Sequence, residues 1–351
     1  MQLNKPSRKK EMFSPSKTLK EYLEKYGRKV KLPIQYDDML RYMASTPLID
    51  TAGKDTLWET VYYEDAERQE INRSLCEIYA LLKTEGNTEV IEHLTVARID
   101  FCTFGNTKPF RVRIINRLND NYDHFYIKQI DSSRIYGLEL EGILSPNRVS
   151  YLTYEKTLIE EHVAGVPGDD FMGKYLDVPK FDQIRIAKEF IKFNERCFVR
   201  LLGDMRAYNY IVDITPDIEG NQYRFRAIDF DQQSYEGWKS FYLPQYFKEN
   251  NPIIYLGIEH LKSEAVRQYQ LEERSLIARR ARSSRMRLNE LLERMCSDTI
   301  SSEDKVRKLS EDLAEHHNND IFYQCSSMGE IVLANIKLVL QKEFIQSIIN
   351  R

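Results

Sequence analysis

LLGDMRAYNYIVD at residues 201–213 and YRFRAIDFDQQS at residues 223–234 are the two stretches of the chain that decide its fold. Their apolar runs alternate with polar residues around the turn PDIEGN, which predicts a β-hairpin of NYIVDIT against YRFRAID. Asp204 and Asn209 lie at or before the start of the first strand, and Asp229 ends the second. Because the outer ends of a hairpin lie at one edge, we expect these three side chains to converge.

Two carboxylates and an amide at one edge suit phosphoryl transfer. One carboxylate can orient and deprotonate an acceptor hydroxyl, while oxygen ligands hold Mg²⁺ against the β- and γ-phosphates of ATP. A D-x-x-x-x-N pattern alone has little value, so the order of the surrounding elements has to support it. The competing interpretation is turn chemistry, because Asp and Asn favour loops and helix caps without any catalysis.

The chain before this hairpin has the pattern of an antiparallel sheet. Short β-rich runs separated by turn-forming residues predict three strands, then a helix, then two more strands. The sequence therefore predicts a five-stranded antiparallel sheet with one helix inserted after the third strand. The strands are LTVARIDFCTF (94–104), FRVRIIN (110–116), HFYIKQI (124–130), RVSYLTYE (148–155) and KTLIEEHVAG (156–165), and the helix is SSRIYGLELEGIL (132–144).

The remaining segments are predicted to be mostly helical. A basic, solvated arm with a helix at TLKEYLEKYGRK is expected within residues 1–31, and a docked helix at residues 65–85. Residues 258–295, rich in Arg and Glu, predict a solvated helix or helical pair. We expect three parts: a basic arm with a helical extension (1–90), a sheet lobe (91–164) and a helical lobe with additions (165–351).

The local motif resembles a known superfamily. GDMRAYNYIV followed by IDFD is similar to the catalytic and metal-binding loops of protein-kinase-like enzymes, H-R-D-x-x-x-x-N and D-F-G. Gly203 before Asp204 matches the H-G-D form of aminoglycoside-phosphotransferase-like small-molecule kinases, which often lack the glycine that Asp231 replaces. Leu202 departs from both groups, which usually place His there. Arg206 stands where protein kinases often have Lys or Arg.

The resemblance implies an α+β, bilobal fold with a five-stranded N-lobe, a helical C-lobe and helical additions at both ends. It implies that Asp204 is the catalytic base and that Asn209 and Asp229 hold Mg²⁺. Arg206 would stabilise the charge that develops on the transferred phosphate.

The resemblance also assigns upstream residues to ATP binding. Lys128, in a context resembling V-A-I-K, would hold the α- and β-phosphates; otherwise it is an exposed strand lysine. Its partner would be Glu139 rather than Glu141, unless both belong to a solvated helix face.

Two further segments would complete the nucleotide site. Gly105 lies in a turn that would cover the phosphates, or is only a hairpin turn. The backbone of Glu161 to Val163 would meet adenine.

The expected activity is transfer of the γ-phosphate of ATP to a hydroxyl group, on a small molecule in the preferred interpretation. An atypical protein kinase is the first alternative, since the segment SYEGWKSFYLPQYF (234–247) would suit a peptide platform. The second is a nucleotide-binding pseudokinase or scaffold whose terminal helices bind a protein.

The amino-acid composition limits the binding partners and the cellular location that we expect. The 51 Lys and Arg residues nearly balance the 54 Asp and Glu residues, so no nucleic-acid partner is expected. No apolar run approaches the roughly 18 residues of a membrane span, and no signal peptide is recognised at the start. The 5 cysteines are scattered without metal-ligand spacing, which favours a reducing cytoplasm.

Overall fold

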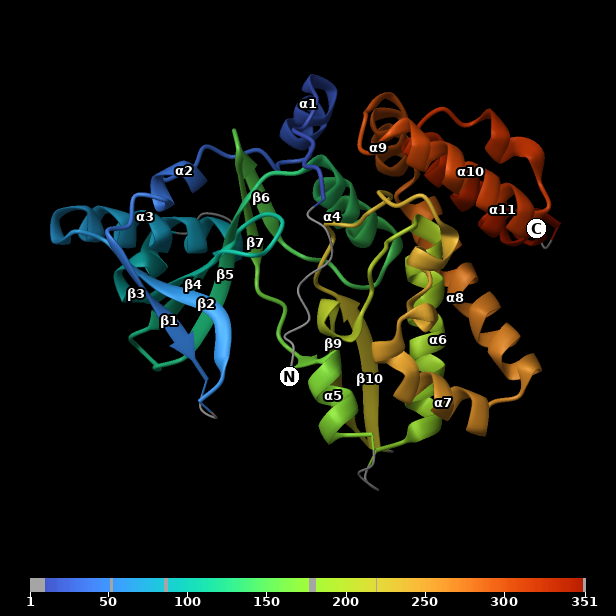
Figure 1. Ribbon diagram of the computed structural model, residues 1–351, viewed down its shortest axis with the longest axis horizontal. Helices are drawn as coiled ribbons and strands as arrows, with labels where there is room; N and C mark the ends of the chain where they lie inside the picture. The colour runs from blue at the N-terminus through green and yellow to red at the C-terminus, as the bar shows by residue number, and fades with distance from the viewer. Residues whose placement is uncertain (1–9, 51–52, 85–87, 177–180, 219, 350–351) are drawn as a thin grey trace. The chain divides into compact units, whose positions relative to one another are not determined.

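The structure, a computed structural model, is an α+β protein (Figure 1). It describes residues 10–50, 53–84, 88–176, 181–218 and 220–349. The chain forms two compact units. Unit 1 comprises residues 1–131 and 149–162, and unit 2 comprises residues 132–148 and 163–351.

Unit 1 is built on an antiparallel sheet of 7 strands in the order β1-β2-β3-β4-β5-β7-β6. The five strands predicted from the sequence are β3 to β7, so the expected order of elements is observed there. The strands are β1 (Ala44–Ile49), β2 (Asp55–Tyr62), β3 (Leu94–Cys102), β4 (Phe110–Asn116), β5 (Tyr122–Gln129), β6 (Tyr151–Tyr154) and β7 (Thr157–Glu161).

Strands β1 and β2 were not predicted, and they extend the sheet beyond five strands. Their residues are mostly exposed or half-buried, so the alternation of buried and solvent-facing residues that marks a strand is weak. Pro47 lies inside β1 next to a register shift, as expected for an edge strand. The sheet therefore has more than the five predicted strands, because β1 and β2 contribute few buried residues and their pattern could not be recognised in the sequence.

The core of unit 1 lies between the sheet and α3 (Asp65–Thr84), which packs against β3, β4 and β7 (Figure 1). Strand β4 shows why the sequence folds this way: Phe110, Val112 and Ile114 are buried, whereas Arg111 and Arg113 between them are half-buried. Side chains two residues apart share a face of a strand, so the apolar set faces the core.

The N-terminal segment is docked on unit 1. Helix α1 (Lys17–Lys25) is the expected helix, and α2 (Tyr36–Met39) follows it. The Lys10 ammonium is buried and lies 2.6 Å from the Asp131 carboxylate, which also accepts a hydrogen bond from the Phe13 amide at 2.8 Å. The solvated arm expected from the charge pattern is therefore wrong at Lys10; residues 1–9 lie outside the described residues.

Unit 2 contains a second antiparallel sheet of 3 strands, β10-β9-β8, surrounded by helices. Helices α5 and α6 pack against β9 and β10, respectively (Figure 1). The predicted hairpin is β9 and β10, and the predicted helical pair is α8 and α9. The elements are α4 (Ser132–Leu144), β8 (Val166–Pro167), α5 (Gly168–Lys174), α6 (Gln183–Arg200), β9 (Tyr210–Asp217), β10 (Gly220–Ala227), α7 (Asn251–His260), α8 (Ser263–Ser283), α9 (Arg285–Ser297), α10 (Glu303–His317) and α11 (Met328–Ile349).

Helix α6 leads directly into the candidate site. The Asp182 carboxylate caps its start by accepting the Arg185 amide at 3.0 Å, and Leu201 ends it in the left-handed conformation, with φ of 56°. Its apolar face packs on β10, which fixes the point from which residues 202–209 depart. Among the described residues, no helix is both long enough and apolar enough to cross a membrane.

Candidate active site

The β9–β10 hairpin brings the two predicted loops together. A short 3-10 helix, Ala207–Asn209, precedes β9. Strand β10 pairs with β9, and the last pair of residues is Ala227 opposite Tyr210. Beyond this pair, the Asn209 carbonyl accepts hydrogen bonds from the amides of Ile228, at 3.0 Å, and Asp229, at 3.4 Å. Asn209 and Asp229 thus lie side by side, as the hairpin pattern predicts.

Asp204 is held on the same loop in an uncommon backbone conformation. Its φ of 58° lies in the left-handed region, which is sparsely populated by residues with a side chain and is enriched at functional sites. The Asn209 amide nitrogen donates to the Asp204 carbonyl at 2.7 Å and to its carboxylate at 3.3 Å. These contacts bring Asp204 to Asn209, and through it to Asp229.

Arg206 bridges Asp204 to a second carboxylate. Its Nε lies 2.9 Å from Asp204 Oδ1, and its Nη1 lies 2.7 Å from Glu249 Oε1. The guanidinium also lies over the Phe247 ring, 4.9 Å from its centroid. Glu249 was not singled out in the sequence, because it lies 43 residues from Arg206 and belongs to no motif.

The Asp204 carboxyl group has a raised pKa. Burial raises the pKa of Asp204 from 3.8 to about 6, against the opposing effect of the ion pair with Arg206. The negative charges of Asp229 and Glu249 contribute smaller parts of the same rise. A carboxylate with a pKa near 6 is mostly ionised at neutral pH, yet is basic enough to accept a proton in catalysis.

A buried asparagine braces this loop. The Asn250 side chain donates to the carbonyls of Met205, at 2.9 Å, and Pro244, at 2.7 Å, and accepts the Tyr210 hydroxyl at 2.8 Å. Because Asn250 is completely buried, each of these bonds replaces one that water could have made. Sequence reasoning missed Asn250, since a lone Asn in an irregular segment gives no signal of this kind.

Two motif positions before Asp204 have packing roles. A Cβ on Gly203 would lie 2.6 Å from the Phe241 ring, so the close approach of these segments requires glycine. Leu202, at the position of the usual His, is completely buried and pairs with Gln233 through a backbone bridge. Gln233 in turn donates to the Arg200 carbonyl at 2.5 Å, so it helps to hold the start of the loop.

Asp229 is paired with an arginine from a distant helix. One nitrogen of Arg134, Nη1, lies 2.8 Å from Asp229 Oδ1 and 2.7 Å from Asp231 Oδ1. The Arg134 side chain, on α4, is only 3% exposed, whereas the Asp229 side chain is 36% exposed. Arg134 was not predicted as a site residue, because it lies 95 positions before Asp229 in the sequence.

Contacts along α4 explain how Arg134 reaches this position. A Cβ on Gly137 would lie 2.9 Å from Phe230 Cβ, so this glycine lets α4 pack directly on the segment between Asp229 and Asp231. In the residue before Gly137, the buried Tyr136 hydroxyl donates to Asp298 at 2.6 Å. Helix α4 is thereby fixed against the loop that carries the two aspartates.

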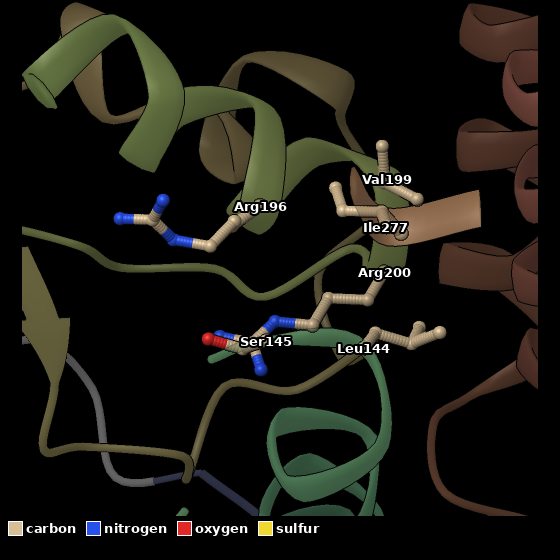
Figure 2. A pocket seen from close by; sticks show the side chains of 6 residues that line it. All are labelled: Leu144, Ser145, Arg196, Val199, Arg200 and Ile277. Atoms are coloured by element: carbon tan, nitrogen blue, oxygen red, sulfur yellow. The ribbon is translucent and has the colours of Figure 1, made fainter. Parts of the chain in front are cut away.

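Glu139 and Glu141 on the same helix are both buried, so the interpretation of a solvated face is wrong. Glu139 pairs with Arg287 of α9 at 2.6 Å, through two guanidinium nitrogens. Glu141 pairs with Arg200 of α6. Figure 2 shows Arg200 extending from α6 toward Ser145, just beyond α4, where the gap among the side chains leaves no room for a water molecule.

Lys128 is buried in unit 1, so it is not an exposed strand lysine. On β5, its ammonium lies 2.7 Å from the Glu160 carboxylate on β7 and 5.1 Å from the Tyr126 ring centroid. Glu160 was not predicted as a partner, although strand pairing places Tyr126 opposite Glu160 and Lys128 opposite Leu158. The predicted pairing of Lys128 with Glu139 joins residues of different units and stays a prediction.

The other predicted nucleotide contacts lie at these places. Gly105 is in the β3–β4 turn, where its carbonyl accepts the Lys108 amide at 3.1 Å. The Glu161 amide donates to Ser150 at 3.0 Å, and its carboxylate binds Lys83 at 3.1 Å. Val163 is buried and begins the second segment of unit 2. Adenine contacts at residues 161–163 stay a prediction.

Asp229 and Asn209 fit a divalent cation bound together with phosphates. Asn209 uses its amide nitrogen for Asp204, so its amide oxygen can serve as a ligand beside the half-exposed Asp229 carboxylate. Among the described residues, no group of three or more His, Cys, Asp and Glu side chains is arranged to hold a metal ion. A site of one carboxylate, one amide and phosphate oxygens does not require such a group.

No protein-family model matches this chain, and no curated protein matches its sequence. Its candidate site is therefore defined by the contacts of Asp204, Asn209 and Asp229 themselves.

Proposed function

We propose that this protein is an ATP-dependent phosphotransferase with a bilobal, protein-kinase-like fold. It transfers the γ-phosphate of Mg-ATP to a hydroxyl group of a small molecule. The observation that carries the proposal is the junction at Asn209, whose side chain binds Asp204 and whose carbonyl binds the amide of Asp229. A base and two metal ligands on adjoining loops are the parts that this reaction needs.

Asp204 is the proposed base. Its carboxylate takes the proton of the acceptor hydroxyl as the oxygen bonds to the γ-phosphorus, and the bond from that phosphorus to the leaving oxygen of ADP breaks. The pKa of Asp204, raised to about 6 chiefly by burial, supports this role, because a base should titrate just below the working pH. Arg206, 2.9 Å from Asp204, supplies positive charge where the transferred phosphate gains negative charge.

Asn209 and Asp229 are the proposed ligands of Mg²⁺, which would neutralise the phosphate oxygens when bound. Lys128 is the proposed contact of the α- and β-phosphates. Its pairing with the buried Glu160 supports this role, because it holds the ammonium in place inside unit 1. Gly105 and the backbone of residues 161–163 complete the proposed ATP site.

The small-molecule acceptor rests on the resemblance of Gly203 and Asp231 to small-molecule kinases. Both residues also have packing or pairing partners, Phe241 and Arg134 respectively, so neither position decides between a small molecule and a protein. The fate of the transferred phosphate does decide it. With labelled ATP and a cell extract, we expect the label in small solutes; label entering protein would favour the atypical protein kinase.

Thermal unfolding tests the ATP site directly. A ligand that binds only the native state raises the melting temperature, so Mg-ATP should stabilise the protein and ATP with a chelator should do so less. Asp229→Asn should lose the metal-dependent part of this shift, whereas Asp304→Asn, at an exposed pair with Arg307 on α10, should keep it. No shift of the wild-type protein at millimolar Mg-ATP would contradict the proposal. Tight Mg-ATP binding without phosphorylation of any acceptor would favour the pseudokinase.

A further inference from the structure

The pairing of Arg134 with two carboxylates is unsymmetrical. The same nitrogen, Nη1, donates to Asp229 at 2.8 Å and to Asp231 at 2.7 Å. The Asp229 side chain is 36% exposed, but the Asp231 side chain is only 9% exposed. An ion from solvent can therefore approach Asp229, whereas Asp231 stays with the buried guanidinium.

The burial of the Arg134 guanidinium makes its second carboxylate partner important. A buried guanidinium that loses its only carboxylate is strongly destabilised, because it is left desolvated without compensation. A guanidinium with two carboxylates can give up one and keep the other. The exposed Asp229 carboxylate keeps its negative charge while it shares the guanidinium with Asp231, so it can attract a cation from solvent.

We propose that Arg134 is an internal counter-ion that competes with Mg²⁺ for Asp229, and that Asp231 retains Arg134 when the metal binds. This inference rests on the proposed metal role of Asp229 and adds two residues that set the affinity of the site for divalent cations. Arg134 holds Asp229 in the protein without metal, and Mg²⁺ takes its place.

The surroundings of the cluster suit an exchange rather than a large movement. The Asp231 amide donates to Asp229 Oδ1 at 3.0 Å, so the two acids stay together whichever cation Asp229 binds. Arg134 also donates to the Ile228 carbonyl at 3.3 Å. Since Gly137 packs α4 against Phe230, the arginine remains beside Asp231 after it releases Asp229.

Binding of Mn²⁺ without nucleotide, followed by electron paramagnetic resonance, tests the inference apart from catalysis. Arg134→Gln removes the competitor, so Mn²⁺ should bind about tenfold more tightly than to the wild type. Asp231→Asn removes the carboxylate that competes with Asp229 for Arg134, so Arg134 should pair more strongly with Asp229 and Mn²⁺ should bind several-fold more weakly. Asp304→Asn, which removes one exposed carboxylate of unit 2, is the control and should bind Mn²⁺ as the wild type does.

The double variant separates retention of Arg134 from direct ligation by Asp231. Without Arg134 there is nothing to retain, so Asp231→Asn should have a much smaller effect in the Arg134→Gln background, where only the loss of its nearby negative charge remains. A direct ligand would weaken binding equally in both backgrounds, and that result would overturn the inference. Unchanged Mn²⁺ affinity in Arg134→Gln would overturn it as well, while leaving the proposed phosphotransferase intact. Failure of the wild type to bind either Mn²⁺ or Mg-ATP would overturn both.

The wild-type protein provides a test that does not depend on folding of Arg134→Gln. The side-chain ¹⁵Nη1 signal of Arg134 reports the hydrogen bonds of that nitrogen, and it can be assigned by its change in Asp231→Asn. We expect this signal to shift on addition of Mg²⁺ with the same midpoint as metal binding. A signal that stays unchanged at saturating Mg²⁺ would overturn the inference.

Discussion

The two loops of the candidate site hold their aspartates in different ways. Asp204 pairs with Arg206, two residues further on, whose side chain is 31% exposed. Asp229 pairs with Arg134, 95 residues earlier, whose side chain is almost completely buried. The first loop is thus largely self-contained, whereas the second depends on the packing of a helix. The environment of the proposed base therefore depends on its own loop, whereas that of the proposed metal ligand depends on a residue of α4.

The largest effects are expected when the two aspartates are exchanged for asparagine. Asp204→Asn should lower kcat by about a hundredfold or more and leave the affinity for Mg-ATP nearly unchanged, because only the acceptor proton is affected. Asp229→Asn should impair both turnover and metal-dependent ATP binding. Steady-state kinetics and titration calorimetry measure the two quantities. Equal kcat in Asp204→Asn and the wild type would show that Asp204 is not the base.

Arg206→Ala should have an intermediate effect. Loss of the charge near the transferred phosphate should lower kcat by about tenfold with little change in ATP affinity. Arg206→Lys keeps the charge but cannot bridge Asp204 and Glu249 as the guanidinium does, so it should recover part of the rate. A higher KM for the acceptor, with kcat unchanged in both variants, would assign Arg206 to acceptor binding instead.

The sequence predicted the local part of the site better than the distant part. The convergence of Asp204, Asn209 and Asp229 was predicted because they flank a hairpin whose pattern and turn are clear in the sequence, and the strands β3 to β7 were predicted from the same alternation. Arg206 was chosen as a candidate through its position in the motif. These predictions depend on neighbours within a few residues, which is the range over which a sequence pattern carries information.

Partners from distant elements could not be predicted. Glu160, Arg134 and Glu249 reach the site residues only because strand register, the packing of α4 at Gly137 and the fold of residues 241–250 bring them there. The arginine partners of the buried Glu139 and Glu141 were missed for the same reason, and the alternative of a solvated helix face was wrong. Their arginine partners lie on α9 and α6, and no local pattern connects them.

Asn250→Ala tests how far the first loop depends on its brace. Removing three hydrogen bonds of a buried side chain should lower the free energy of unfolding by about 2–3 kcal/mol, and kcat several-fold because Asp204 is less firmly positioned. Asn335→Ala is the matched control: Asn335 is also completely buried and donates to two carbonyls, of Phe198 and Val199. It should be destabilised similarly, with kcat unchanged under conditions where both proteins are folded. Equal kcat in the two variants would show that Asn250 contributes to stability but does not position Asp204.

The smallest and most specific effects are expected in the pH dependence of kcat/KM. Since Asp204 must be ionised to act as base and its pKa is raised to about 6, kcat/KM should rise with pH through that value and then level off. The negative charge of Glu249 raises the pKa of Asp204. Glu249 also pairs with the Arg206 guanidinium, whose positive charge lowers that pKa. Glu249→Gln should therefore move the acidic limb to lower pH.

Arg206→Ala should move the same limb in the opposite direction. Loss of Arg206 removes the hydrogen bond and positive charge that lower the pKa of Asp204, so burial and the nearby carboxylates should raise that pKa further. The pH profiles of the wild type, Glu249→Gln and Arg206→Ala, measured at low acceptor concentration, give the three midpoints. Opposite shifts would identify the titrating group as one that both residues contact, which in this site is Asp204. Shifts of the same sign, or a limb that persists in Asp204→Asn, would assign the titration to another group and remove Asp204 as the base.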